Sequence, residues 1–155
     1  MAKKQTADLA LRLDNQICFA VYSTAHAFNR VYKPLLDRLG LTYPQYLAML
    51  ALWQRSPMTI GELGEALGLD SATSTPLIKR MEAGGLVTRR RDVADERRVL
   101  VEPTAKGQAL RANMKGVTGA LDCAMPLKRA ELKALHDTLT RLVAGLRDAV
   151  AEPEE

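Results

Sequence analysis

The sequence predicts a mostly helical chain with one small β-hairpin, and three observations support this. Thr42 with Gln45 and Thr59 with Glu62 form capping boxes, which mark helix starts. A glycine-containing turn follows the second box. Two short strand-like segments then flank the charged stretch 92–96. Helix, turn, helix and hairpin in this order are typical of a winged helix-turn-helix.

The first long helix is expected from Asp14 to Gly40. Asp14 is a favourable N-cap, apolar residues recur behind it at helical spacing, and Gly40 suits a helix end. Pro34 should kink or interrupt this helix. The next helix should begin at Thr42, where Pro44 is tolerated in the first turn.

A helix-turn-helix is expected next. Its first helix begins at Thr59, its turn contains Gly68, and its second helix covers about residues 71–82. Two strands should follow over 86–91 and 97–102, joined by a charged loop. These strands are the predicted wing.

Two further helices are expected towards the C-terminus. One runs from Thr104 to about Cys123, and Pro126 separates it from the last helix. Leucines in the last helix follow spacings of 3, 4, 3 and 4 residues, which is typical of core packing or of a dimer interface. We favour a dimer interface formed by Leu132, Leu135, Leu139, Leu142 and Leu146.

The distribution of charge points to nucleic acid. Between Ser71 and Arg98, seven basic residues oppose four acidic ones, an excess of +3 in a chain of net charge +4. Short hydroxyl side chains let a helix lie deep in the major groove, and arginines suit phosphate and minor-groove contact. A solvated basic face would explain any one of these features alone. A turn, a hydroxyl-rich helix and an arginine-bearing hairpin in this order favour DNA binding. The candidate contacts are Ser71, Thr73, Ser74, Thr75, Lys79, Arg80, Arg89, Arg90, Arg97 and Arg98.

Length and composition indicate one domain over residues 1–155, with 47% hydrophobic and 26% charged residues. No basic leader with an apolar core opens the sequence, and no segment has the roughly 20 apolar residues of a membrane helix. We therefore expect a cytoplasmic protein with no membrane partner. Residues 42–103 should form the DNA-binding lobe, and residues 14–40 and 104–150 a helical dimerisation region. A symmetric dimer would suit a pseudo-palindromic site on double-stranded DNA.

Cys18 is a candidate redox-active thiol, although a lone cysteine is most often a small buried hydrophobe. If Asp14 caps the helix, Cys18 ends its first turn, where the helix dipole favours the thiolate. A thiolate attacks peroxides to give sulfenic acid. Tyr22 and Tyr32 share its helical stripe, but Tyr32 is 14 residues away, about 21 Å along a straight helix. Tyr32 could therefore assist Cys18 only from a second subunit, and ordinary interface tyrosines fit equally well.

No metal or cofactor site is predicted. The two cysteines have no CxxC spacing, and Cys18 and His26 are about 12 Å apart on a helix, too far to chelate one ion.

Two long segments resemble a known family. LDNQICFAVYSTAHAFNRVYKPLLDRLGLTYPQYLAMLALW and TIGELGEALGLDSATSTPLIKRMEAGGLVTRRRDVADERRVLVEPTAKG closely resemble the organic-hydroperoxide-sensing repressors of the MarR family. The match runs from Leu13 to about Gly107. NQICFA matches the reactive-cysteine motif of these repressors, and DVADERR matches their wing signature.

The resemblance implies a role for each matching residue. Cys18 would be the peroxide-reactive thiol, with Tyr32 and Tyr43 of the opposite subunit as hydrogen-bonding partners and Tyr22 nearby. Cys123 matches the position of a resolving cysteine, as in two-cysteine members of the family.

On the wing, the resemblance implies that Arg97 enters the minor groove and that Asp95 braces it. The terminal helices would form the interface of a MarR-like homodimer. The reduced dimer would bind an operator and repress transcription. An organic hydroperoxide would oxidise Cys18, which would then form an intersubunit disulfide with Cys123 and release the DNA.

Two rival functions remain open at this point. A repressor of the same fold released by a phenolic or aromatic ligand would need neither cysteine. A thiol peroxidase is disfavoured, because nothing in the sequence resembles a peroxidase scaffold, and we expect no enzymatic activity.

Overall fold

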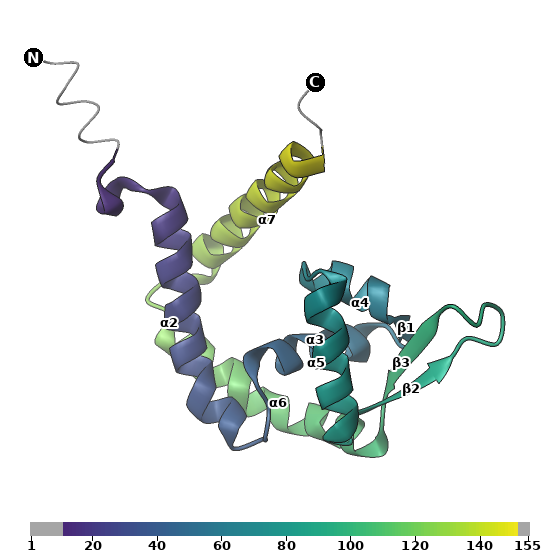
Figure 1. Cartoon of the computed structure of the whole chain (residues 1–155). Helices are drawn as coiled ribbons and strands as arrows, with labels where there is room; N and C mark the ends of the chain where they lie inside the picture. Colours follow the sequence, from purple (N-terminus) through teal and green to yellow (C-terminus); the bar gives the residue numbers. More distant parts are fainter. Residues whose placement is uncertain (1–10, 152–155) are drawn as a thin grey trace, which may run out of the picture. The chain divides into compact units, whose positions relative to one another are not determined.

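The computed structural model describes residues 11–151 and confirms the mostly helical fold with a small antiparallel sheet (Figure 1). The elements are, in order, η1 (Leu13–Asn15), α2 (Ile17–Asp37), α3 (Tyr43–Gln54), β1 (Met58–Thr59), α4 (Ile60–Leu67), α5 (Ser71–Ala83), β2 (Val87–Arg91), β3 (Val99–Pro103), α6 (Ala105–Ala124) and α7 (Arg129–Ala151).

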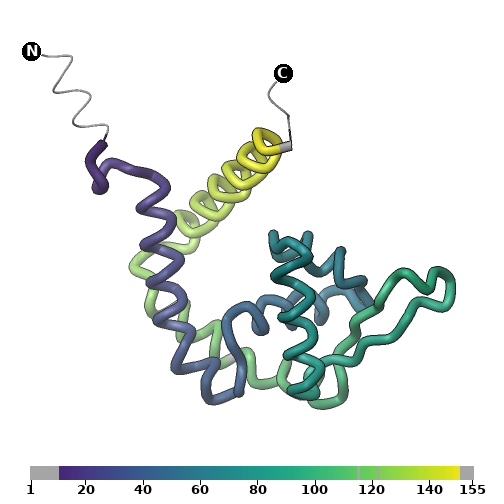
Figure 2. Tube along the Cα trace, in the orientation of Figure 1, coloured from purple at the N-terminus to yellow at the C-terminus, as the bar shows by residue number. Residues whose placement is uncertain are grey.

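The chain forms two compact units. The first ends at Leu121 and contains every element from η1 to most of α6, whereas the second begins at Asp122 and contains α7. Within the first unit, α3, α4 and α5 lie beside the β2–β3 hairpin (Figure 2).

Both capping boxes form. The Thr42 N–H donates to Gln45 Oε1 (2.8 Å), and the Gln45 N–H donates back to Thr42 Oγ1 (3.5 Å). The Thr59 N–H donates to Glu62 Oε2 (2.7 Å), and the Glu62 N–H donates to Thr59 Oγ1 (3.1 Å). Each box satisfies backbone donors that the first helical turn leaves unpaired, which is why α3 and α4 begin where the sequence predicts.

The bounds of the first long helix differ from the expectation. Asp14 lies in η1 and pairs with Arg12 (2.7 Å), so it does not cap α2, which begins after Gln16 without a side-chain cap. Pro34 lies inside α2 and does not interrupt it. The helix ends at Asp37, and Gly40 has a φ of 66° in the turn that follows.

The sheet contains one more strand than the sequence predicts. Its order is β1-β3-β2, and both pairings are antiparallel. β2 and β3 form the expected hairpin, with Arg91 opposite Val99. The two-residue strand β1 places Thr59 opposite Leu100, so the start of α4 is joined directly to the wing.

The core of the first unit lies between the end of α2, the three helices of the lobe and the sheet. The largest fully buried side chains come from all of these elements: Leu36, Met49, Leu52, Leu63, Ile78, Met81, Val87 and Val101. By contrast, Ile17 and Val21 on the first half of α2 are exposed. Burial of the core therefore fixes the helix-turn-helix against the wing and leaves an apolar surface near the start of α2 uncovered.

The first turn of α6 is bonded to the end of α5. Thr104 Oγ1 donates to the Gly85 carbonyl (2.7 Å) and accepts from the Gly107 N–H (3.0 Å). Trp53 Nε1 donates to the Gly107 carbonyl (3.2 Å). A Cβ at Gly107 would collide with the carbonyl oxygen of Leu86, so only glycine permits this close approach.

We expect Gly107→Ala to lower the free energy of unfolding by about 1–3 kcal/mol, because the added methyl group forces the backbone of α6 away from Leu86. Gly116→Ala is the matched control in the same helix, since a Cβ there meets nothing within 4 Å. It should raise stability by about 0.5–1 kcal/mol through its helix propensity. Urea unfolding measures both changes, and equal effects of the two variants would contradict the close approach.

Candidate functional site

Helix α5 is built to present one polar face. The Asp70 carboxylate accepts from the Thr73 N–H (2.7 Å) and caps the helix. Leu77, Ile78 and Met81 are buried and form the opposite, apolar face of the helix. The remaining face carries exposed Ser71, Thr73, Lys79 and Arg80, with Thr75 half-buried.

Ser74 is not on that face, which corrects the sequence-based prediction. Its side chain is only 2% exposed. It packs against α4, where a Cβ on Gly64 would lie 3.1 Å from Ser74 Oγ. Small residues at these two positions let α4 and α5 approach closely, so Ser74 contributes to the packing of the helix-turn-helix and is not available to DNA.

The wing turn brings Asp95 and Arg97 together. Arg97 Nε donates to Asp95 Oδ1 (3.1 Å), and so does the Arg97 backbone N–H (3.1 Å). These hydrogen bonds hold the pKa of the Asp95 carboxyl below its ordinary value. Arg97 is 91% exposed, so it projects from the wing while Asp95 constrains its direction.

Two of the three arginines of β2 are paired with acids. Arg89 is half-buried and bonds to Glu82 on α5 (2.6 Å), a contact that joins the wing to that helix and that the sequence does not reveal. Arg90 lies 3.4 Å from Glu102 on β3. Arg91 is exposed and makes no ion pair within residues 11–151.

Cys18 is the second residue of α2, one position from the helix start. Its side chain is exposed, and the thiol is free. Tyr22 lies one turn further along, also exposed, with its ring 4.3 Å from that of His26. Because α2 runs unbroken to Asp37, Tyr32 lies about 21 Å from Cys18 in the same chain.

Tyr32 and Tyr43 belong instead to a cluster of three tyrosines. Their ring centroids are 5.0 Å apart, and Tyr46 lies 5.4 Å from Tyr32. Tyr32 is 8% exposed. Burial, and then the neighbouring Tyr46, raise the pKa of Tyr43. Tyr46 was not predicted as a site residue, although its spacing of three residues from Tyr43 places both on one face of α3.

A cavity of about 280 Å³ opens beside this cluster, between the end of α2 and the start of α3. Its walls include Asn29, Lys33, Leu36, Thr42, Tyr43 and Pro44.

Cys123 is the penultimate residue of α6, and its thiol is free and exposed. Across the described part of the chain, no group of three His, Cys, Asp or Glu residues could hold a metal ion. No helix among the described residues is long and apolar enough to span a membrane.

Comparison with known proteins places the fold in a family. The MarR family model matches residues 41–99. The organic hydroperoxide resistance transcriptional regulator of Bacillus subtilis is 42% identical over 136 residues, covering 88% of this chain and 92% of that protein. The chain belongs to the MarR family.

Two other relatives are informative. The HTH-type transcriptional regulator TtmR of Methylorubrum extorquens is 46% identical over 136 residues, covering 88% of this chain and 68% of that protein. Reduced AbfR bound to DNA superposes with a TM-score of 0.74 at 33% identity, covering 92% of this chain and 99% of AbfR. AbfR in its disulfide form is also similar, with a TM-score of 0.61 at 33% identity over 90% of this chain and 98% of that one.

These likenesses confirm the predicted family and the winged helix-turn-helix fold. The chain is a transcriptional regulator, similar to an organic hydroperoxide resistance regulator and to DNA-bound AbfR, and regulators of this family bind DNA and are not enzymes.

We expect Glu82→Gln to destabilise the chain at neutral pH and to have little effect in acid. Arg89 holds the pKa of the Glu82 carboxyl below its ordinary value. The ion pair therefore stabilises the fold above the unfolded-state pKa of about 4.3, and this contribution is lost as the pH falls through the lower folded-state pKa. Thermal melts over this range measure the difference between variant and parent.

Glu65→Gln is the matched control, since Glu65 is exposed on α4 and makes no ion pair within the described residues. Equal shifts for the two variants, or a penalty for Glu82→Gln that persists in acid, would contradict the pairing of β2 with α5.

Proposed function

We propose that this chain is a cytoplasmic, redox-sensing repressor that acts as a homodimer. The reduced dimer binds a pseudo-palindromic operator in double-stranded DNA, and an organic hydroperoxide releases it by oxidising Cys18. The observation that carries this proposal is the free, exposed thiol of Cys18 in the first turn of α2. The likeness to a hydroperoxide resistance regulator and to AbfR supports it.

The position of Cys18 suits a reactive thiolate. The first-turn N–H groups of a helix have no partner within the helix, and together with the helix dipole they favour an anion there. The thiolate attacks one peroxide oxygen, the O–O bond breaks, and the alcohol leaves after taking up a proton. Cys18 then carries a sulfenic acid.

We assign the resolving role to Cys123 of the partner chain. Its thiol attacks the sulfenic sulfur, the S–O bond breaks, and water leaves as the disulfide forms. Exposure of both thiols and the disulfide form of AbfR support this step. Joining two chains covalently at these positions would move their DNA-binding lobes out of register with the operator.

Three tyrosines are proposed to hydrogen-bond the reactive sulfur. Tyr22 is one helical turn from Cys18 in the same chain, whereas Tyr32 and Tyr43 would act from the opposite subunit, because about 21 Å of α2 separates Tyr32 from its own Cys18.

The exposed face of α5 is proposed to read the major groove. Hydroxyls and cations at its surface would contact base edges and phosphates: Ser71, Thr73, Thr75, Lys79 and Arg80. On the wing, we propose that Arg97 enters the minor groove, braced by Asp95, and that Arg90 neutralises phosphate. Arg89 is assigned to the junction with α5, because it is half-buried and its pair with Glu82 is short (2.6 Å), whereas Arg90 is exposed and lies 3.4 Å from Glu102.

A second candidate function rests on the cavity beside Tyr43. Its size and its aromatic wall would suit a small phenol or aromatic ligand, and the ammonium of Lys33 already pairs with Asp37 (2.8 Å), which also lines the cavity. Release of DNA by such a ligand from a Cys18→Ser variant would favour this candidate.

Cys18→Ser is expected to remain bound to DNA after treatment with cumene hydroperoxide, whereas the parent protein dissociates, because serine cannot form a sulfenic acid. The measurement is fluorescence anisotropy on duplexes selected from a random library by the reduced protein. Reduction with dithiothreitol should restore binding of the parent protein. Release of Cys18→Ser by the peroxide would overturn the assignment of the sensor.

Cys123→Ser separates the two chemical steps. It should still form sulfenic acid on Cys18, which dimedone detects, but should give no dimer-sized band on a non-reducing gel. A peroxide-induced dimer band that survives this substitution would refute the resolving role of Cys123 while leaving the sensor in place.

A further inference from the structure

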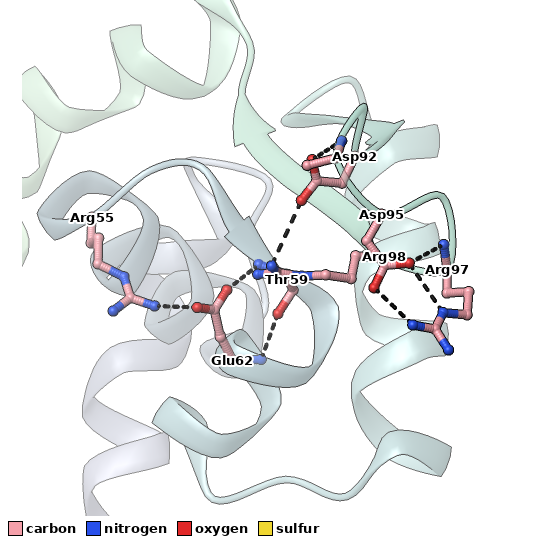
Figure 3. A network of polar contacts seen from close by, with 8 residues as sticks. Arg55, Thr59, Glu62, Asp92, Asp95, Arg97 and Arg98 are labelled. Carbon is pink, nitrogen blue, oxygen red and sulfur yellow. Dashed lines mark hydrogen bonds and ion pairs between the residues drawn. The ribbon is translucent and has the colours of Figure 1, made fainter.

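Arg97 and Arg98 are adjacent on the wing, but their side chains have different surroundings. Arg97 is 91% exposed and contacts only the turn that carries it, through Asp95. Arg98 is 50% exposed, and its guanidinium lies 3.8 Å from the partly buried carboxylate of Asp92. Figure 3 shows the Arg98 side chain directed from the wing towards the capping box of α4.

Glu62 of that capping box faces several positive or donating groups. One carboxylate oxygen accepts from the Thr59 N–H (2.7 Å), and the other bonds to Arg55 at the end of α3 (2.9 Å). The capping hydrogen bonds chiefly, and the charges of Arg55 and Arg98 in addition, lower the pKa of the Glu62 carboxyl. An anionic Glu62 therefore stands between the end of α3 and the base of the wing (Figure 3).

The backbone fixes this arrangement from both sides. Thr59 pairs with Leu100 in the sheet, two residues after Arg98. The Asp92 N–H donates to the Arg98 carbonyl (2.9 Å), which closes the base of the wing loop. Arg98 consequently lies at the base of the wing, near Asp92 and within reach of the charge of Glu62, and it is less exposed than Arg97 (50% against 91%).

We propose that Arg98 and Glu62 are positioning residues that hold the wing against α4, and that Arg97, not Arg98, supplies the wing's charge to DNA. A carboxylate at the start of a helix near DNA would repel phosphate, and the ion pair with Arg55 together with the nearby charge of Arg98 offsets that repulsion. This proposal rests on the DNA-binding function. From the sequence, both arginines are candidate DNA contacts, whereas the proposal keeps Arg97 as the contact and makes Arg98 a positioning residue.

The first test is the salt dependence of binding to a random-sequence duplex. Arg97→Gln should lower the slope of log K against log salt by about 1, because one cation that displaces counterions from the DNA is lost. Arg98→Gln should weaken binding without changing that slope. A slope lowered as much by Arg98→Gln as by Arg97→Gln would overturn the proposal.

The second test is a thermal double-mutant cycle. Glu62→Gln keeps the capping box, since glutamine also accepts from the Thr59 N–H, and removes only the charge. Combined with Arg98→Gln, it should lower the melting midpoint by less than the sum of the two single shifts. Combined with Arg97→Gln as the matched control, the shifts should add. Additive shifts for Glu62→Gln and Arg98→Gln would contradict the coupling of these two side chains, whether or not the protein binds DNA. Failure of the parent protein to bind the duplex would instead refute the DNA-binding function.

Discussion

The main physical constraint on this protein is that its terminal helices carry apolar side chains that a single chain leaves exposed. The leucines of α7 form a stripe along one side of that helix, and Leu135, Leu139, Leu142 and Leu146 are all exposed within a single chain. Ile17 and Val21 near the start of α2 are exposed as well. Because contiguous apolar surface is rarely left in water, we propose that a second copy of the chain covers these helices.

The proposed chemistry also requires a second chain. Cys18 sits at the start of α2, whereas the buried tyrosine cluster lies at its far end, about 21 Å away. A chain acting alone therefore cannot bring Tyr32 to its own thiol. The lobe, by contrast, is complete within one chain, since its capping boxes, core and wing contacts are all internal. In the proposed function, each lobe therefore binds DNA by itself, whereas oxidation of Cys18 requires residues of two chains.

Local patterns made most of the fold predictable from sequence. The two capping boxes act between residues three apart, so the starts of α3 and α4 could be placed correctly. Contacts between distant residues could not be foreseen. The strand β1, for example, is too short to recognise before β3 is beside it. Nor does the sequence decide between two local partners of Asp14, which looks like a helix cap but pairs with Arg12, two residues before it.

The same limit applies to the site. Ser74 follows the hydroxyl pattern of its neighbours, yet its direction is set by the close approach of α4 at Gly64. Arg89 and Arg98 read as free cations in the sequence, and only the folded lobe shows the acids that face them. Caps that act within one helix were predicted correctly, whereas side-chain directions set by a neighbouring element, as for Ser74 and Arg89, were not.

The mass of the reduced protein in solution tests the central claim most directly. Sedimentation equilibrium at the concentrations that bind DNA should give twice the chain mass of 17.0 kDa. Leu139→Asp, in the middle of the α7 stripe, should shift the protein towards the monomer and weaken DNA binding in parallel. A wild-type protein that sediments as a monomer while it binds DNA would contradict the claim that the functional unit is a dimer.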